Sequence, residues 1–315
     1  MITYFVTKPH SYTIETYLNT WGRPLSRRFR VVPYSSLMAD TAIEFRPGTY
    51  IFSDIERMGP VMTKRIANAW REIADLGAAT RIFNHPSRSM RRYELLRTLF
   101  EDGKNVFNAY RLVECRRPQR WPVFIRDENE HTKNLTGLLN SPEELDAAVA
   151  EIFEAGGSRE DKMVVEFCDT RDDRGLFHKY TAFLIGDRVI PRDFKRSPHW
   201  VVLARDAEAT SRSIAEERSY IEANPHEQQI REIFRLARID YGKIDYGMLG
   251  GRMQVWEINT NPNIFSSSEY KVLASKDPAD AESKETLLLV AEAFAVAFAE
   301  VDVRDASVNG IFRSA

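Results

Sequence analysis

The sequence predicts an α/β protein, α+β in its larger part, in which a small open parallel sheet precedes antiparallel hairpins packed with helices. Over about the first 80 of the 315 residues, short apolar runs alternate with helical patterns, which is typical of parallel strands joined by crossover helices. Further along, apolar runs come in pairs around Gly186-Asp187 and Gly250-Gly251, which is typical of hairpins. The length allows two or three subdomains, and we expect them at 1–80, 81–160 and 161–315.

The N-terminal region is expected to hold three strands and one long helix. The strands are predicted at 2–6, 29–34 and 49–54, and the helix over 61–77, with Gly77 in the place of a C-terminal glycine cap. Asp54 ends the third strand, where α/β proteins place groups that face a ligand. A turn aspartate that caps the next helix is the alternative for Asp54, and it is the favoured one.

The middle and last regions mix strands and helices. In the middle region we expect a basic helix over 87–103, strands near 105–112 and 121–126, and a helix over 141–157. The helix over 141–157 has the clearest start signal, because Ser141 is an N-cap, Pro142 follows it and Glu144 stands three residues after the cap. The last region is expected to hold a strand at 162–169, hairpins over 178–194 and 243–259, and helices over 225–239 and 283–301.

Composition argues against several classes of protein. Lysine and arginine (44) nearly balance aspartate and glutamate (46), so bulk charge predicts neither a nucleic-acid nor a membrane partner. Cys115 and Cys168 are far apart, which fits a reducing compartment and gives neither a disulfide framework nor a zinc site. The N-terminus lacks a signal-peptide pattern, and the most apolar helix, over 287–298, is interrupted by Glu292 and too short to span a bilayer. We therefore expect a cytoplasmic protein.

The stretch VWEINTNPN, at 255–263, carries polar side chains that a strand alone does not need. Asp245 lies on the first strand of the last hairpin, and Glu257 and Asn259 lie on the second, so all three can face one side of the sheet. A few hard oxygen ligands of this kind suit Mg²⁺ shared with substrate phosphates. Alternatively, Glu257 pairs with a nearby arginine and Asn259 shapes the turn before Pro262.

This order of hairpin, helix and acidic hairpin resembles the ATP-grasp superfamily, over about residues 80–300, most specifically in IDYGKIDYGMLGGRMQVWEINTNPN at 239–263. The N-terminal region is similar to the domain that precedes the grasp in carboxylate-amine ligases of the glutathione synthetase and ribosomal-protein glutamate ligase type. The resemblance implies that Asp245, Glu257 and Asn259 bind the Mg²⁺ ions that bridge the phosphates of ATP. It also implies a small grasp subdomain at 81–160 and a C-terminal subdomain at 161–315.

The resemblance further implies a nucleotide hinge at the end of the strand MVVEFCD. Backbone groups around Phe167 and Cys168 would bind adenine, and Glu166 or Asp169 would hold polar groups of the nucleotide. Apolar neighbours there provide the slot that a purine needs. Alone, this stretch also reads as an ordinary buried strand.

Three cations on or just after the first hairpin are candidates for phosphate binding: Lys179, Arg192 and Lys195. Arg192 is the best candidate because a guanidinium grips phosphate or carboxylate with two bonds. For Lys195 a solvated basic edge is an equal alternative.

Two positions depart from the superfamily pattern. Arg126 stands where a lysine before a glycine-rich loop is expected, and the loop has no glycine before Gly137, so His131 or Lys133 would cover the phosphates instead. An earlier lysine is replaced by Arg91 or Arg92.

The implied reaction is attack of a substrate carboxylate on the γ-phosphate of ATP, followed by attack of an amine on the acyl phosphate. His199 and the segment 261–268, which begins at Asn261, would line the acceptor site, although ordinary loop polarity explains them as well. The alternatives are a phosphotransferase of the same fold and a noncatalytic nucleotide-binding module. The substrates would be small-molecule or peptide carboxylates and amines, and a homodimer is the default expectation for the assembly.

Overall fold

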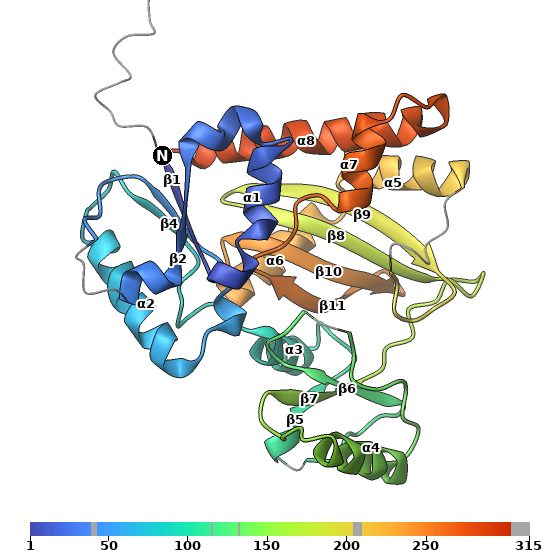
Figure 1. The fold of residues 1–315 in the computed structure, drawn as a ribbon. Coiled ribbons are helices and arrows are strands. Elements are labelled where there is room, and N and C mark those ends of the chain that lie inside the picture. The colour runs from blue at the N-terminus through green and yellow to red at the C-terminus, as the bar shows by residue number, and fades with distance from the viewer. Residues whose placement is uncertain (39–42, 115, 132, 204–209, 304–315) are drawn as a thin grey trace, which may run out of the picture.

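The computed structural model describes residues 1–38, 43–114, 116–131, 133–203 and 210–303, and it contains three sheets (Figure 1). A parallel sheet is formed by the N-terminal region, a small antiparallel sheet by the middle of the chain, and a large antiparallel sheet by the hairpins. The predicted α/β class and the small parallel N-terminal sheet are confirmed.

The N-terminal sheet has the strand order β2-β1-β3-β4, and every pair in it is parallel. Its strands are β1 (Ile2–Val6), β2 (Phe29–Pro33), β3 (Thr49–Phe52) and β4 (Arg81–Phe83). The helices are α1 (Tyr12–Asn19) and α2 (Pro60–Ala74), with the short 3-10 turn η4 (Ile55–Arg57) before α2. β4 begins past the expected limit at residue 80 and still extends this sheet.

The small sheet has the order β5-β7-β6, with β5 (Ala109–Arg111), β6 (Val123–Asp127) and β7 (Lys162–Glu166). Helices α3 (Arg92–Glu101) and α4 (Pro142–Glu154) belong to this region. The predicted cap of α4 is confirmed, because the backbone N–H of Glu144 donates to Ser141 Oγ at 3.3 Å. β7 begins past the expected limit at residue 160, yet it lies between β5 and β6.

The large sheet has the order β11-β10-β8-β9. It consists of the two predicted hairpins, β8 (Phe177–Ile185) with β9 (Arg188–Ser197) and β10 (Tyr241–Leu249) with β11 (Arg252–Asn259). The helices of this part are α5 (Ser211–Ala223), α6 (Glu227–Ala237), α7 (Ser267–Ala274) and α8 (Ala281–Val301). Sequence analysis did not predict α5 or α7.

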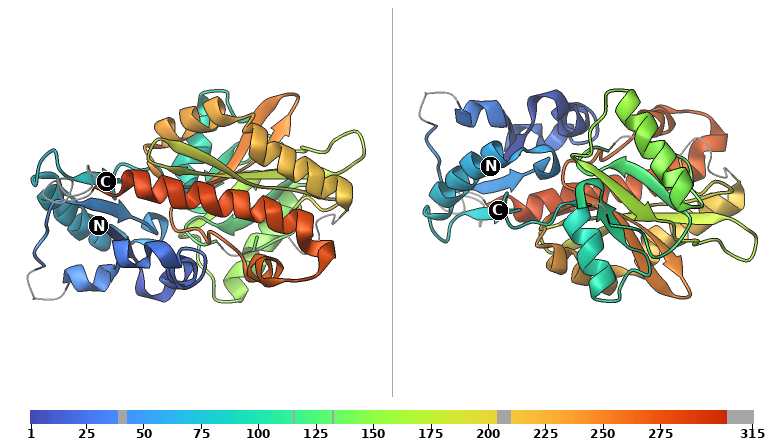
Figure 2. Two further views of the ribbon diagram at one scale, coloured as in Figure 1. Left: turned by 90° about the horizontal axis from the view of Figure 1, so that it is seen from above. Right: turned by 90° about the horizontal axis from the view of Figure 1, so that it is seen from below.

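Both faces of the large sheet carry apolar cores. On one face, Ala182 and Ile244 pack against Ile230 and Phe234 of α6, and α3 closes the same cluster. On the other face, the outer half of β8 and β9 packs against α8 and the N-terminal sheet. Figure 2 shows α8 running along the sheet toward the N-terminal strands. The inner half of this second face stays free for the site described below.

Two buried asparagines join the N-terminal sheet to the large sheet. Asn84 follows β4, and its side chain donates to the carbonyls of Phe52 (3.0 Å) and Tyr241 (2.9 Å) while accepting from the N–H groups of Asp240 and Tyr241. Asn261 follows β11 and accepts from the hydroxyls of Tyr4 and Thr13. The N-terminal sheet is therefore fixed against the last hairpin.

None of the helices that the structure describes combines the length and apolar composition that a membrane crossing requires.

Candidate active site

A cavity of about 330 Å³ lies between the small sheet and the free half of the large sheet. This volume falls at the low end of the range of about 300–1,000 Å³ that is usual for small-molecule sites. Its apolar end is lined by Phe107, Phe124, Val165, Phe167, Cys168, Phe177, Trp200, Val201, Val202, Leu203 and Trp256. Its polar end is lined by Arg126, His131, Lys133, Asn134, Lys179, Asp245 and Glu257, with Glu166 and Thr170 also in the wall.

A β-bulge in the last hairpin shapes the polar end. Asp245 lies directly opposite Glu257, but Tyr246 pairs with Val255, so Trp256 is an extra residue. Such a bulge lets two successive side chains face the same way, and Trp256 and Glu257 both line the cavity. Gly247 makes room for the indole, because a Cβ there would lie 2.7 Å from the Trp256 ring.

The three predicted metal ligands share one face of the sheet. Asp245 is opposite Glu257, and Asn259 is opposite Lys243 two residues further along the hairpin. The carboxylate of Asp245 lies 3.2 Å from Lys243 Nζ and 3.9 Å from Lys179 Nζ. Two carboxylates and an amide fit Mg²⁺ that shares its other positions with phosphate and water. Within the described ranges, no three His, Cys, Asp or Glu side chains form a metal-binding group of their own.

Both contacts of the alternative interpretation are present as well. Glu257 pairs with Arg92, and Asn259 Oδ1 accepts from the N–H of Asn261 at 2.8 Å. Arg126 lies 3.6 Å from the same Glu257 oxygen. Although burial opposes the charged carboxylate, Arg92, His131 and Arg126 hold the pKa of Glu257 well below its usual value. Glu257 is therefore an anion that is held by protein cations.

Arg126 and Arg92 differ in their roles. Arg126 lines the cavity, and burial together with the charge of Arg92 lowers the pKa of Arg126 to about 10. Arg92 is 4% exposed and donates to the carbonyls of Asp127, Glu128 and Glu130, so it fixes the segment after β6. Arg91 instead donates to the carbonyl of Met58. Arg92 is thus the one of the two predicted arginines that reaches the carboxylate.

His131 connects this site to the N-terminal region through Glu56 of η4. Its Nε2 lies 2.7 Å from Glu56 Oε1, and its Nδ1 lies 3.7 Å from Glu257 Oε2. Burial lowers the pKa of His131, but the two carboxylates outweigh it and raise that pKa overall. Burial likewise opposes the charge of Glu56, yet hydrogen bonds from His131 and Thr260 lower its pKa to about 2.

Glu56 was not predicted as a site residue. It stands two positions after Asp54, in a segment whose only sequence signal was the end of a strand. Asp54 itself is buried and contacts Thr7, His10 and Arg57, and its side chain makes no helix-capping hydrogen bond. Asp54 therefore occupies the N-cap position of η4, as the favoured interpretation expects, but its side chain does not cap the helix.

Of the predicted hinge residues, some line the cavity and one holds a neighbouring loop in place. Phe167 and Cys168 line the apolar end, and burial raises the pKa of the Cys168 thiol to about 11. Glu166 is 1% exposed and accepts from Tyr110, from the N–H groups of Gln119 and Arg120, and from the N–H of Asn108. Glu166 thus orders the neighbouring loop.

The last predicted hinge residue, Asp169, lies outside this wall. It is exposed, pairs with Arg171 and is not among the lining residues. Cys115 lies outside the described residues.

Phe167 was predicted for the apolar end of the cavity, but the aromatic residues Trp200 and Phe124 beside it were not. Trp200 lies 4.9 Å from Phe124 and 6.0 Å from Phe167, measured between ring centroids. The prediction came within one residue of Trp200, since the neighbouring His199 was predicted as a substrate residue. His199 is exposed and does not line the cavity, whereas its neighbour Trp200 does.

The predicted catalytic cations lie beside the cavity rather than in its wall. Arg192 is the extra residue of a second bulge, since Thr181 pairs with Asp193 and Ala182 with Pro191. Its guanidinium lies 2.7 Å from Glu269 and donates to the carbonyl of Ile264 at 2.8 Å. These contacts fasten α7 and the segment before it to the sheet.

Lys195 and Asn261 complete the set of predicted residues. Lys195 Nζ lies 3.7 Å from Asp193 and 3.6 Å from Glu217, and Asp193 makes the largest contribution to its raised pKa. Lys179 is opposite Lys195 in the hairpin and does line the cavity. Asn261 is buried at the joint with the N-terminal sheet, as described above.

Comparison with known proteins gives matches to solved structures alone. No protein family and no curated protein matches the sequence. A D-alanine–D-alanine ligase from Bacillus anthracis complexed with ATP is 12% identical, with a TM-score of 0.48 over 95% of this chain and 98% of that one. The ATP-grasp ligase PsnB complexed with a phosphomimetic variant of its minimal precursor, Mg and ADP is 13% identical, with a TM-score of 0.49 over 92% and 97%. Matches at these identities and TM-scores assign no function to the chain.

Proposed function

We propose that the chain is an ATP-grasp ligase that uses ATP to join a carboxylate to an amine, with release of ADP and phosphate. One observation carries the proposal: Asp245 and Glu257 lie opposite each other at the polar end of a cavity whose other end is aromatic. ATP has two matching parts: a flat base that suits the aromatic end, and a charged triphosphate that binds Mg²⁺ and suits the polar end.

The residues of the cavity have distinct tasks in this proposal. Trp200 and Phe124 enclose the base, and the backbone around Phe167 and Cys168 orients it. Arg126 and Lys179 bind phosphate oxygens and stabilise the charge that moves as the γ-phosphoryl group is transferred. Asp245, Glu257 and Asn259 would hold Mg²⁺, which when bound supplies further positive charge at those oxygens.

The transfer needs no covalent bond to the protein. A carboxylate oxygen of the substrate attacks the γ-phosphorus, and the bond to the oxygen of the leaving ADP breaks. The amine then attacks the acyl carbon of the acyl phosphate, and phosphate leaves. Positioning and charge stabilisation carry the rate. The roles of Arg192, Lys195, His199 and Asn261, a cytoplasmic location and a homodimer stay predictions.

The test is ADP release from Mg-ATP with a pool of carboxylic and amino acids, and with hydroxylamine as a trap. A hydroxamate formed together with ADP supports the acyl-phosphate route and identifies the carboxylate by mass spectrometry. Glu257→Gln is expected to abolish Mg-dependent ADP formation while the fold is retained. The exposed Glu154→Gln on α4 serves as the matched control. Normal turnover in Glu257→Gln would contradict the metal assignment.

One observation favours a second candidate, a nucleotide-binding module without catalysis. Glu257 is already neutralised by Arg92 and lies close to Arg126 and His131. A metal would have to displace these partners. Tight ATP binding that does not depend on Mg²⁺, without ADP release for any acceptor, would favour this module over the ligase.

A further inference from the structure

Helix α2 has a second face that packs against no apolar core. Its inner face carries Ile66 and Ile73, which are fully buried against the N-terminal sheet. A second set of residues repeats every three or four positions, and this spacing places them along one side of a helix. They are Pro60, Thr63, Lys64, Ala67, Asn68 and Arg71, and all of them line one cavity.

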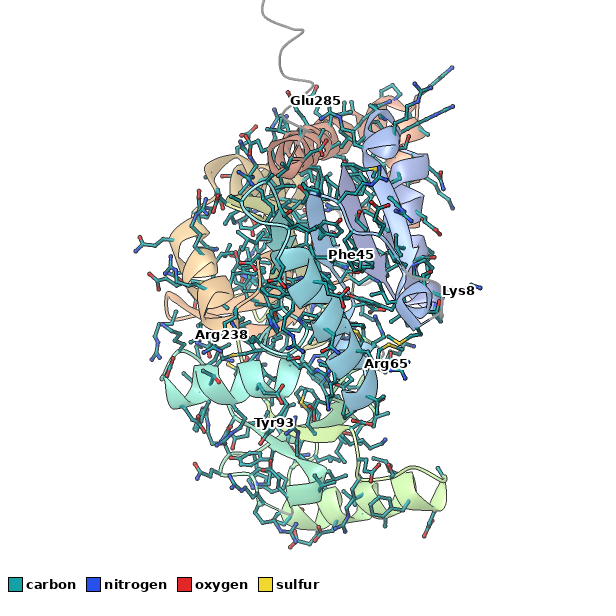
Figure 3. The ribbon with its side chains drawn as sticks, turned by 90° about the vertical axis from the view of Figure 1, so that its left-hand side faces the viewer. Lys8, Phe45, Arg65, Tyr93, Arg238 and Glu285 are labelled. Atoms are coloured by element: carbon teal, nitrogen blue, oxygen red, sulfur yellow. The ribbon has the colours of Figure 1, made fainter. Side chains whose placement is uncertain are left out.

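The opposite wall of this cavity is formed by residues 86–91, Glu94 of α3 and Arg111 of β5. The cavity has a volume of about 580 Å³, and none of its lining residues lines the proposed nucleotide cavity. Residues of both α2, which bears Arg65, and α3, which bears Tyr93, line the cavity, and Figure 3 shows both helices. We call this cavity the α2 groove.

The α2 groove carries an excess of positive charge. Lys64, Arg71, Arg88 and Arg91 make no ion pair with a carboxylate of the described residues. Among the described residues of the lining, Glu94 alone carries a carboxylate, and it pairs with Arg111 at 2.7 Å. The charge of Arg88 also acts on His85, which lies outside the lining. Burial makes the largest contribution to the lowered pKa of His85, and the charge of Arg88 adds to it.

The arrangement of the charges indicates an extended ligand. Lys64 and Arg71 are seven residues apart on α2, which at about 1.5 Å per residue separates them by about 10 Å along the helix. Arg88 and Arg91 stand on the facing wall. A compact anion would meet one or two of these cations, whereas an extended chain with acidic side chains about 7 Å apart on one face would meet them in succession.

The residues of the lining also indicate which of two classes of polyanion fits the groove. Nucleic-acid grooves of single strands combine cations with aromatic side chains on which bases stack. The apolar members of this lining are Pro60, Ala67, Pro86 and Met90, and no aromatic residue is among the lining residues that the structure describes. Asn68 and Ser87 add polar groups suited to carboxylates or backbone, whereas the hydroxyls of Thr63 and Ser89 are already bonded within the protein. These features favour acidic polypeptide over nucleic acid.

We propose that the α2 groove is a docking site for an acidic polypeptide segment. The inference goes beyond the proposed ligase activity and does not depend on it, because the groove cations lie outside the nucleotide cavity. Charge complementarity supplies the attraction, and the binding is therefore weakened by salt.

The experiment is fluorescence anisotropy with a fluorescein-labelled octaglutamate peptide and the full-length protein at several salt concentrations. Single charge reversals Lys64→Glu, Arg71→Glu and Arg88→Glu are each expected to weaken binding at least tenfold. Arg65→Glu is the matched control, because Arg65 is exposed on the same helix outside the groove and contacts Met38 Sδ. It changes the net charge equally and is expected to alter the affinity less than threefold.

Three further measurements make the outcome decisive. Labelled octalysine is expected not to bind the groove, and labelled oligothymidine is expected to bind more weakly than octaglutamate. ATP affinity, measured separately, is expected to stay the same in all four variants, so a failed ligase proposal and a failed docking proposal are distinguishable. Absence of octaglutamate binding at millimolar peptide, equal losses in Arg65→Glu, or tighter oligothymidine binding would each overturn the proposal.

Discussion

Asn84 gives a prediction whose size follows from the contacts of one side chain. It makes four hydrogen bonds with backbone groups of Phe52, Asp240 and Tyr241, at 2.9–3.0 Å, and it is 1% exposed. Asn84→Ala removes all four and leaves buried backbone groups without partners. At about 1 kcal/mol for each bond, the free energy of unfolding falls by about 4 kcal/mol.

The backbone of Asn84 adds a second contribution that can be separated. Its φ is 63°, in the left-handed region, which costs an alanine about 1 kcal/mol more than a glycine. Asn84→Gly is therefore expected to be about 1 kcal/mol less destabilising than Asn84→Ala. The difference in unfolding free energy between the two variants measures the backbone contribution. The loss of unfolding free energy that both variants share measures the contribution of the hydrogen bonds.

Thermal unfolding followed by circular dichroism measures both effects. With about 2–4 °C of Tm per kcal/mol, Asn84→Ala is expected to lower the Tm on the order of 10 °C. The control is Asn19→Ala, at an exposed position at the end of α1, which is expected to change the Tm by less than about 2 °C. A Tm loss below about 3 °C in Asn84→Ala, or a glycine variant less stable than the alanine variant, would refute the reasoning.

Three further changes test the site. Arg126→Ala removes a cation from the cavity wall and is expected to weaken ATP binding about tenfold in a fluorescence titration; an unchanged affinity would show that Arg126 does not replace the expected lysine. Gly247→Ala places a Cβ 2.7 Å from the Trp256 ring and is expected to cost about 1–3 kcal/mol and to shift tryptophan emission. Gly137→Ala, which meets nothing within 4 Å, is its control, and equal effects would contradict the steric argument. The pKa of Glu56 is lowered to about 2 in the folded protein. The ionised carboxylate therefore stabilises the folded state fully above the unfolded pKa near 4.5, and this stabilisation is lost as the pH falls toward 2. Relative to Glu56→Gln, the wild type is therefore expected to lose about 2 kcal/mol of unfolding free energy between pH 6 and pH 3 in urea titrations, and parallel pH profiles would contradict it.

Local signals predicted most of the elements. Ser141 with Glu144 predicted the start of α4, and Gly250-Gly251 predicted the last hairpin, because caps and turns depend on a few neighbouring residues. Helix α5 was missed because its sequence has no apolar stripe, and Tyr220 is its one buried residue. Its start is fixed by a capping box that joins Thr210 and Ser213.

The site was harder to predict than the elements, since it depends on contacts between distant segments. Asp245 and Glu257 were predicted to share one face, but spacing around the turn does not by itself bring them together. Regular pairing from Leu249 and Arg252 would place Trp256 opposite Asp245 and turn Glu257 to the other face, and the bulge at Trp256, which spacing does not reveal, brings Glu257 opposite Asp245. Glu56 reaches the site only because the N-terminal region folds back against the large sheet, and no local pattern records that.

The shared core of the N-terminal and large sheets has a mechanical consequence. Tyr4 and Ile51 of one sheet pack in the same cluster as Phe183 and Tyr241 of the other, so the two sheets form a single body. One face of the small sheet has a separate core with α4, and the other face shares a cluster with α3, Leu249 and Trp256 beside the nucleotide cavity. A movement that widens the entrance for a ligand would therefore shift the small sheet relative to the other two sheets, and that movement would have to loosen this second cluster.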